Sequence, residues 1–328
     1  MSSVKPTVLI VLDGWGHAEA GPHNAVTCAP ARNFLKWMEE WPHALLSASG
    51  EEVGLPLGLM GNSEVGHTNI GAGRTVNQTI TRIDESIRSG EFTGISAIRG
   101  AIDHARSHAS HLHLFGLVGS GGVHASDQHC RAVLEMADSL GLPGENIRFH
   151  AILDGRDTPP TSAAGFLEDL ETMLAEQGGR LVTIGGRYWG MDRDQNWERT
   201  RRFWRAMVLG KADYSAGSWR EALALGKERG ETDEFLAPTL LGGGTDGVTE
   251  GDAVFSLNFR SDRVRQITEA FLFPEFFGFD RGRHPSVHFA SMTHYRDDFP
   301  CPVAFPKEQL HSLFGELVAA KGLRQFRC

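Results

Sequence analysis

Short apolar segments alternate with amphipathic segments along most of the chain, and this alternation constrains the fold most strongly. Thr7–Leu12 and Leu112–Val118 are nearly continuous apolar runs, which is typical of strands buried on both faces of a sheet. Between such runs, apolar residues recur at helical spacing, as Phe34, Trp37 and Trp41 do within Ala31–Trp41. The pattern predicts an α/β protein built on a mostly parallel sheet flanked by helices.

The same two patterns recur to the end of the chain. Further strands are predicted over His43–Ala48, Ile147–Leu153, Leu181–Ile184, Ala253–Asn258 and Val287–Met292, and the terminal Gly322–Cys328 has strand character. Further helices are predicted from Ser63 onward and over Thr75–Ser89, Ile95–His108, Ala163–Ala175, Trp197–Leu209, Trp219–Lys227, Asp262–Leu272 and Gln309–Ala320.

Composition excludes several classes of function. The chain has 328 residues, enough for one large or two ordinary domains, and a formal net charge of -9 that argues against a nucleic-acid binder. No apolar run approaches the roughly 20 residues of a membrane span, and the chain starts without a signal-peptide pattern. The four cysteines (Cys28, Cys130, Cys301, Cys328) are scattered, which predicts free thiols, a cytoplasmic protein and no structural zinc site.

Two residues of the N-terminal region are candidates for metal or phosphate chemistry. Asp13 follows the first predicted strand and precedes a glycine, a position from which a carboxylate can hold a metal ion or simply form an Asx-turn. Ser63 lies where a loop becomes a helix, so the positive end of the helix dipole would stabilise a phosphate on it. An ordinary N-cap serine is the structural alternative.

A glycine-rich loop follows the predicted strand Leu112–Val118 and carries His124. Glycines let the backbone approach a bound anion closely, and an imidazole beside them can contact that anion. The neighbouring His111, His113 and His129 are interpreted as structural or exposed.

Arginines recur just beyond three predicted strands and indicate the class of ligand. They are Arg156 in Asp154-Gly-Arg-Asp-Thr158, Arg187 and Arg193 after the next strand, and Arg260 and Arg263 in Asn258-Phe-Arg-Ser-Asp-Arg263. Guanidinium groups bind phosphate and carboxylate bidentately, so their convergence predicts a small ligand that carries both groups. Salt bridges with the interleaved aspartates are the alternative for any single pair.

Taken in order, these blocks resemble the signatures of cofactor-independent phosphoglycerate mutases. The matching segments are Asp13-Gly-Trp-Gly, Asn62-Ser-Glu-Val-Gly-His-Thr-Asn-Ile-Gly-Ala-Gly-Arg74, Leu112-His-Leu-Phe-Gly-Leu-Val, Asp154-Gly-Arg-Asp-Thr, Gly186-Arg-Tyr with Asp192-Arg-Asp194, and Asn258-Phe-Arg-Ser-Asp-Arg263. The match spans essentially the whole chain, and the block around Ser63 is the most specific.

The resemblance implies an alkaline-phosphatase-like domain formed by residues 1–75 and 303–328, with an α/β phosphotransferase domain inserted at residues 76–302. It implies that Ser63 is the phosphorylated nucleophile and that Asp13 and Ser63 bind one of two Mn²⁺ or Mg²⁺ ions. The residues that it implies for binding phosphoglycerate are His124, Arg156, Asp157, Arg187, Arg193, Arg260 and Arg263.

The implied reaction moves the phosphoryl group of 3-phosphoglycerate to Ser63 and returns it to the 2-hydroxyl, in glycolysis and gluconeogenesis, without 2,3-bisphosphoglycerate. Metal coordination activates a serine hydroxyl, which is otherwise a poor nucleophile. Asp157 is the candidate base for the substrate hydroxyl because it lies beside a substrate-binding arginine. We expect a monomer with a small-molecule substrate and no nucleic-acid or membrane partner.

The chain departs from the family pattern in two places. Where the family has Ser-Asp-Gly-Gly-Val-His-Ser, this chain has Gly119-Ser120-Gly-Gly-Val-His124-Ala125, so this stretch offers His124 no acidic neighbour. The family also continues into a lysine block and further Asp and His metal ligands, positions that are absent here. We therefore expect a C-terminally truncated member with an incomplete phosphatase-like domain, weak metal binding and no mutase activity, whose inserted domain still binds phosphoglycerate.

Two alternatives stay open. Another enzyme of the alkaline phosphatase superfamily, such as a phosphopentomutase or a phosphohydrolase, would share Asp13 and a metal-bound nucleophile, although the arginine blocks argue against it. The second alternative is an inactive fragment that retains only phosphoglycerate binding.

Overall fold

The computed structural model describes residues 6–243 and 247–327 and divides the chain into two compact units. The first unit consists of Met1–Thr81 and Leu310–Cys328, and the second unit is Arg82–Gln309. The boundaries expected from the sequence, 76 and 302, lie a few residues earlier. Val303–Phe305 belongs to the second unit because it forms a strand, β8, that pairs with the preceding strand of that unit.

The second unit is built on one sheet of eight strands in the order β4-β5-β3-β2-β1-β6-β7-β8. The strands are β1 (Leu112–Val118), β2 (Ile147–Leu153), β3 (Arg180–Gly186), β4 (Tyr214–Ala216), β5 (Thr239–Leu241), β6 (Ala253–Ser256), β7 (His288–Thr293) and β8. Every neighbouring pair is parallel except β3 with β5. The mostly parallel sheet predicted from the sequence is confirmed.

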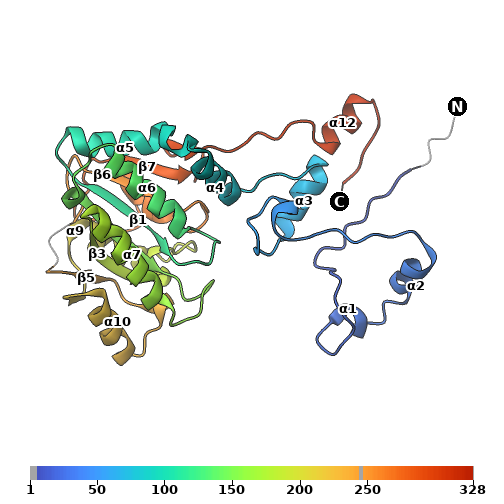
Figure 1. Cartoon of the computed structure of the whole chain (residues 1–328), viewed down its shortest axis with the longest axis horizontal. Coiled ribbons are helices and arrows are strands. Elements are labelled where there is room, and N and C mark those ends of the chain that lie inside the picture. The colour runs from blue at the N-terminus through green and yellow to red at the C-terminus, as the bar shows by residue number, and fades with distance from the viewer. Residues whose placement is uncertain (1–5, 244–246, 328) are drawn as a thin grey trace. The chain divides into compact units, whose positions relative to one another are not determined.

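Helices cover both faces of this sheet, so the second unit has three layers (Figure 1). Residues of α5 (Ser96–Ser107), α6 (Asp127–Ser139), α7 (Ala163–Gln177) and α10 (Trp219–Glu228) pack in one core with one face of the strands. Residues of α9 (Trp197–Leu209) and α11 (Arg265–Leu272) pack in a second core on the opposite face. The remaining helical segments are α4 (Thr79–Ser89), α8 (Arg187–Gly190) and the 3-10 turns Glu91–Gly94, Gly144–Asn146 and Asp233–Phe235.

Strand β1 shows why its sequence forms a buried central strand. Leu112 and Leu114 belong to one core, whereas Phe115 and Leu117 belong to the other, because successive side chains of a strand point to opposite faces. All seven residues of β1 are buried. The apolar run therefore supplies both cores at once.

Parallel pairing of β3, β2, β1 and β6 brings the carboxyl ends of four adjacent strands to the same edge of the sheet. The loops that leave these ends carry the conspicuous polar motifs of the sequence. The carboxyl edge of a parallel sheet is where ligands bind in open α/β folds.

The first unit contains short helices and little buried apolar surface. Its helices are α1 (Ala25–Cys28), α2 (Arg32–Glu40), the 3-10 turn Glu51–Val53, α3 (Ser63–Ala72) and α12 (Phe314–Ala320). Within residues 6–81 and 310–327 the backbone forms an isolated bridge between Ser49 and Met60 but no strand.

The strands predicted for Thr7–Leu12, His43–Ala48 and the terminal segment from Gly322 are therefore wrong for the residues described. Val8, Leu9 and Ile10 are exposed, because an apolar run becomes a strand only where another strand accepts its backbone hydrogen bonds.

Two expectations drawn from composition can be compared with the described residues. Cys28, Cys130 and Cys301 are free thiols, and Cys328 lies outside the described residues. Over the described part of the chain, no helix has the length and apolar character that crossing a membrane requires.

Candidate functional site

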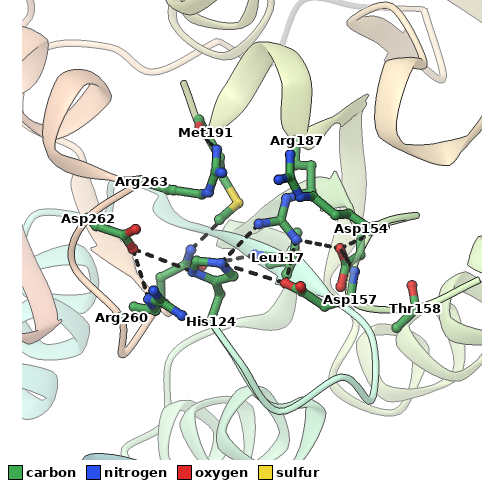
Figure 2. Close-up of polar contacts among 12 residues, drawn as sticks. Leu117, His124, Asp154, Asp157, Thr158, Arg187, Met191, Arg260, Asp262 and Arg263 are labelled. Carbon is green, nitrogen blue, oxygen red and sulfur yellow. Dashed lines mark hydrogen bonds and ion pairs between the residues drawn. The ribbon is translucent and has the colours of Figure 1, made fainter. Parts of the chain in front are cut away.

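Polar side chains from four strand-end loops meet at the carboxyl edge of the sheet in the second unit (Figure 2). His124 lies in the loop after β1, and Asp154 and Asp157 lie in the loop after β2. Arg187 is the first residue of α8, directly after β3, and Asp262 lies in the loop after β6. Figure 2 shows His124 between Asp262 on one side and the group of Asp154, Asp157 and Arg187 on the other.

Arg187 is the centre of the buried half of this site. Its side chain is 3% exposed, and Nη1 lies 2.6 Å from Asp154 Oδ1 and 2.6 Å from Asp157 Oδ2. Its other terminal nitrogen, Nη2, donates to His124 Nε2 at 2.9 Å. The guanidinium thus joins the loops after β1, β2 and β3 through charge-assisted hydrogen bonds.

The loop after β2 is shaped to present these carboxylates. Asp154 Oδ1 accepts hydrogen bonds from the backbone N–H groups of Arg156 and Asp157, at 3.2 and 3.0 Å. Gly155 has a φ of +67°, and a Cβ there would lie 2.7 Å from the backbone nitrogen of Glu234. Only glycine combines that conformation with so close an approach, so the motif Asp-Gly-Arg-Asp is a turn that fixes Asp154.

His124 is neutral at physiological pH. Burial, and after it the charge of Arg187, lowers its pKa to about 4. Because Nε2 accepts the hydrogen bond from Arg187, the ring proton is assigned to Nδ1. Nδ1 is buried, has no hydrogen-bond partner among the described residues, and lies 3.9 Å from Asp262 Oδ1.

His124 is held in place without an acidic residue in the Gly119–Ala125 stretch. The backbone N–H of Phe259 donates to the carbonyl of His124 at 2.8 Å, and Arg187 holds the ring. The contacts that hold His124 therefore come from Arg187, directly after β3, and from Phe259 in the loop after β6.

The exposed half of the site gathers around Asp262. Arg193 Nη1 lies 2.8 Å from Asp262 Oδ2, and Arg260 Nε lies 3.1 Å from Asp262 Oδ1. The side chains of Arg193 and Arg260 are 45% and 51% exposed. Arg263 donates to the carbonyl of Met191 at 3.3 Å, and burial followed by the charges of Arg187 and Arg193 lowers its pKa. Burial is the larger cause of this shift, and the two neighbouring guanidinium groups add to it.

Two of the predicted residues are placed less favourably for their predicted roles, Arg156 for binding an anion and Asp157 for acting as a base. Arg156 is 57% exposed, and its Nη1 lies 3.7 Å from Glu234 Oε1. Burial alone would raise the pKa of Asp157, but the hydrogen bond and charge of Arg187 lower it overall. While paired with Arg187, Asp157 is therefore a weak base.

In the first unit, Ser63 and Asp13 lie side by side although they are far apart in sequence. Ser63 Oγ donates to Asp13 Oδ2 at 2.8 Å and lies 3.3 Å from His67 Nδ1. The N-cap of α3 is Asn62, whose Oδ1 accepts from the backbone N–H of Val65. Ser63 is the first residue of the helix, and Asn62 caps it. The Ser63 hydroxyl is therefore not used as the helix cap.

Asp13 Oδ2 and Ser63 Oγ are adjacent oxygen donors, the kind of ligand that hard divalent cations prefer. A two-metal centre needs more ligands than these. In the part of the chain that the structure describes, no group of three His, Cys, Asp or Glu side chains with ligand geometry includes Asp13.

One group of three residues among those described could hold a metal ion, at the opposite edge of the sheet. His111, His113 and Asp252 have ligand atoms within 4.8 Å of one another. However, His113 Nε2 lies 3.2 Å from Asp252 Oδ2, and Thr249 donates to the same oxygen from its backbone N–H and its Oγ1. These atoms already satisfy one another, so the contacts fit a hydrogen-bonded His–Asp pair that joins β1 to β6.

The other histidine interpreted as structural is also paired. His129 is fully buried and lies 2.7 Å from Asp84 Oδ1 through its Nε2.

Two acidic residues were not singled out from the sequence. Asp154 and Asp262 belong to motifs that carry the predicted arginines, and both pair with those arginines. The available signal was the position of Asp154 directly after β2 and of Asp262 in the segment that follows β6. The site therefore combines four guanidinium groups with three carboxylates and a neutral imidazole.

A site of this kind can bind a small dianion. Exposed guanidinium forks can leave Asp262 for a phosphate or carboxylate group, while Arg187 and His124 form a fixed floor.

Comparison with known proteins identifies relatives of the whole chain. The family model for the N-terminus of 2,3-bisphosphoglycerate-independent phosphoglycerate mutase matches residues 83–297. The mutase of that name from Moorella thermoacetica is 46% identical over 98% of this chain and 63% of its own length. One from Methanosarcina barkeri is 44% identical over 98% of this chain and 63% of its own length.

A solved structure of Leishmania mexicana phosphoglycerate mutase, crystallised at low cobalt concentration, matches with a TM-score of 0.80 and 34% identity. The match covers 96% of this chain and 60% of that one. The chain thus spans less than two thirds of the length of these relatives, and the predicted α/β fold class is confirmed by both kinds of comparison.

Proposed function

The chain belongs to the family of 2,3-bisphosphoglycerate-independent phosphoglycerate mutases, and from this premise we propose that it interconverts 3-phosphoglycerate and 2-phosphoglycerate through a phosphorylated Ser63. The observation that carries the proposal is the group of Arg187, Arg193, Arg260 and Arg263 at one edge of the sheet. Phosphoglycerate carries a phosphate and a carboxylate, the two groups that guanidinium forks bind bidentately.

The second unit holds the substrate in this proposal. Arg193 and Arg260 are half-exposed and can turn toward an incoming anion. Arg187 is oriented by Asp154 and Asp157 before any ligand arrives. Fixed donors need no reorganisation when negative charge develops near them, which favours phosphoryl transfer.

Ser63 of the first unit accepts the phosphoryl group in this proposal. Its hydroxyl donates to Asp13 at 2.8 Å, so the carboxylate orients the oxygen and can take up its proton. A phosphate on Ser63 would lie at the N-terminus of α3, where first-turn N–H groups and the helix dipole stabilise negative charge. Mn²⁺ or Mg²⁺ held by Asp13 and Ser63, when bound, would lower the pKa of the hydroxyl and neutralise phosphate charge.

Asp157 is the proposed base for the substrate hydroxyl. In the unliganded site Arg187 holds its pKa below the usual range. A phosphoglycerate anion that accepts hydrogen bonds from Arg187 would weaken the Arg187–Asp157 pair and raise the basicity of the carboxylate. Substrate binding would thus activate its own base.

A second candidate function is phosphoglycerate binding without turnover. The small number of metal ligands at Ser63 favours this candidate. Asp13 and Ser63 supply two oxygens, and among the described residues no group of three His, Cys, Asp or Glu ligands includes Asp13. Two oxygens do not hold two cations a few ångströms apart.

A coupled assay of 2-phosphoglycerate formation from 3-phosphoglycerate, with Mn²⁺ present and 2,3-bisphosphoglycerate absent, separates the candidates. Turnover that disappears in Ser63→Ala, together with a phosphate on Ser63 detected by mass spectrometry, supports the mutase reaction. Binding of 3-phosphoglycerate without turnover at any Mn²⁺ concentration supports the second candidate. Turnover that requires added 2,3-bisphosphoglycerate would refute the role of Ser63.

A further inference from the structure

We propose that Asp262 is an internal competitor of the substrate: in the free protein its carboxylate occupies the exposed arginines, and an incoming phosphate must displace it. The proposal rests on the proposed function for the identity of that substrate, phosphoglycerate. It assigns to Asp262 control over affinity and release instead of a contact with the reacting atoms.

The contacts of Asp262 are those of a small anion in an arginine site. One oxygen lies 2.8 Å from Arg193 and the other 3.1 Å from Arg260. Arg193 lies between α8 and α9, and Arg260 lies in the loop after β6, so a single carboxylate draws together the forks that a phosphate would use. Burial alone would raise the pKa of Asp262, but Arg193 and Arg260 lower it overall, so the group is ionised.

The two halves of the site differ in how easily their arginines can be released. Arg187 is 3% exposed and bound to two aspartates at 2.6 Å, which suits a permanent part of the structure. Arg193 and Arg260 are 45% and 51% exposed, and exposed ion pairs stabilise proteins only weakly. A phosphate dianion can therefore exchange with Asp262, whereas it cannot exchange with Asp154.

A hydrogen-bond donor lies within reach of the displaced carboxylate. His124 Nδ1 is buried without a hydrogen-bond partner among the described residues. It faces Asp262 Oδ1, the oxygen that is ion-paired with Arg260, across 3.9 Å. This distance is too long for a hydrogen bond and can be closed by a small movement of the aspartate. Asp262 can thus exchange its arginines for His124, and its negative charge is not left unpaired.

The test is isothermal titration of the full 328-residue protein and its Asp262→Asn variant with inorganic phosphate and, separately, with 3-phosphoglycerate. The amide keeps the shape of the side chain but removes the competing charge. We expect inorganic phosphate to bind on the order of tenfold more tightly, since two exposed ion pairs no longer have to be broken. Asp262→Glu, which keeps the carboxylate, should retain wild-type affinity within about threefold.

Asp194→Asn is the matched control. Asp194 lies beside Arg193 in the sequence and loses the same charge on substitution, whereas among the described residues the ion pairs of Arg193 and Arg260 are with Asp262. An equal gain in phosphate affinity in this control would attribute the effect to net charge and overturn the proposal.

The sign of the change distinguishes a competitor from a structural residue. If Asp262 only orders the arginines for substrate, Asp262→Asn binds phosphate equally or more weakly, and the proposal is wrong. A thermal midpoint lowered by more than about 10 °C would equally mark Asp262 as structural.

Failure of the proposed function gives a different result. In that case 3-phosphoglycerate does not bind the wild-type protein, while inorganic phosphate still binds more tightly to the Asp262→Asn variant.

Discussion

Replacing Arg187 by methionine should destabilise the second unit more than any other single change at the site. The guanidinium is 3% exposed and bonds Asp154, Asp157 and His124. Methionine has a similar length but neither charge nor donors. Asp154, with a side chain 1% exposed, would remain as a buried carboxylate without its cation.

The magnitude follows from that uncompensated charge. Removing one partner of a buried ion pair costs about 3–5 kcal/mol, because the remaining charge stays desolvated. Asp157 adds little to this cost, since its side chain is 24% exposed and water can solvate it. For a unit of this size, each kcal/mol lowers the thermal midpoint by about 2–4 °C, so the expected decrease is roughly 6–20 °C.

The assay is hydrogen exchange of the β1, β2 and β3 amides as a function of urea concentration, which reports on the second unit alone. Arg156→Met is the matched control. Arg156 lies between Asp154 and Asp157 in the loop after β2, but its side chain is 57% exposed and lies 3.7 Å from Glu234. We expect this control to change the free energy of unfolding by less than about 0.5 kcal/mol. If Arg187→Met and Arg156→Met are equally stable, the Arg187 network does not hold the loops together.

Three further predictions concern individual side chains. Burial and Arg187 lower the pKa of His124 to about 4. As the pH decreases, the imidazole is therefore protonated in the unfolded chain before it is protonated in the folded protein, and the free energy of unfolding should fall by about 3 kcal/mol between pH 6.5 and pH 4. In urea titrations His124→Gln should flatten that part of the pH profile, and an unchanged profile would contradict the prediction. Asn62→Ala should cost α3 about 1 kcal/mol because Asn62 is the N-cap, whereas Ser63→Ala should cost less than about 0.5 kcal/mol; circular dichroism melts that rank them in reverse would make Ser63 the cap. Arg260→Lys and Arg263→Lys should each weaken 3-phosphoglycerate binding by about 1–3 kcal/mol, since lysine lacks the planar fork; unchanged titration isotherms in both would show that these arginines are structural.

The central strands could be predicted from the sequence because their patterns leave little choice. Leu112–Val118 and Ile147–Leu153 are short, mainly apolar segments, and both form strands with those bounds. The three-residue strands β4, β5 and β8 are too short to show a period. Helix α6 was missed although its buried Cys130, Val133 and Leu134 have helical spacing.

The N-terminal region shows where an apolar pattern is insufficient. Thr7–Leu12 has the composition of a buried strand, yet it forms none in the described residues, and Leu9 and Ile10 are exposed. A strand depends on a partner that supplies hydrogen bonds, and that partner lies far away in sequence. Composition specifies the apolar character of such a segment but not its pairing.

The candidate site could be predicted in outline but not in its pairings. The rule that ligands bind at the carboxyl edge of parallel strands predicts that His124, Asp157, Arg187 and the loop after β6 lie together, as they do in Figure 2; their role in ligand binding stays a prediction. The partners of each guanidinium could not be predicted, because long side chains from different loops can reach several carboxylates. The hydrogen bonds of Arg187 and the position of Asp262 between Arg193 and Arg260 required coordinates.

The most direct test of the account is isothermal titration of the 328-residue protein with 3-phosphoglycerate, 2-phosphoglycerate and glycerate. The account predicts saturable binding of both phosphoglycerates at one site, much weaker binding of glycerate because it lacks the phosphate, and loss of phosphoglycerate binding when Arg193 and Arg260 are both replaced by methionine. Equal binding of glycerate, or unchanged phosphoglycerate binding in the double variant, would contradict the claim that these arginines form the phosphoglycerate site.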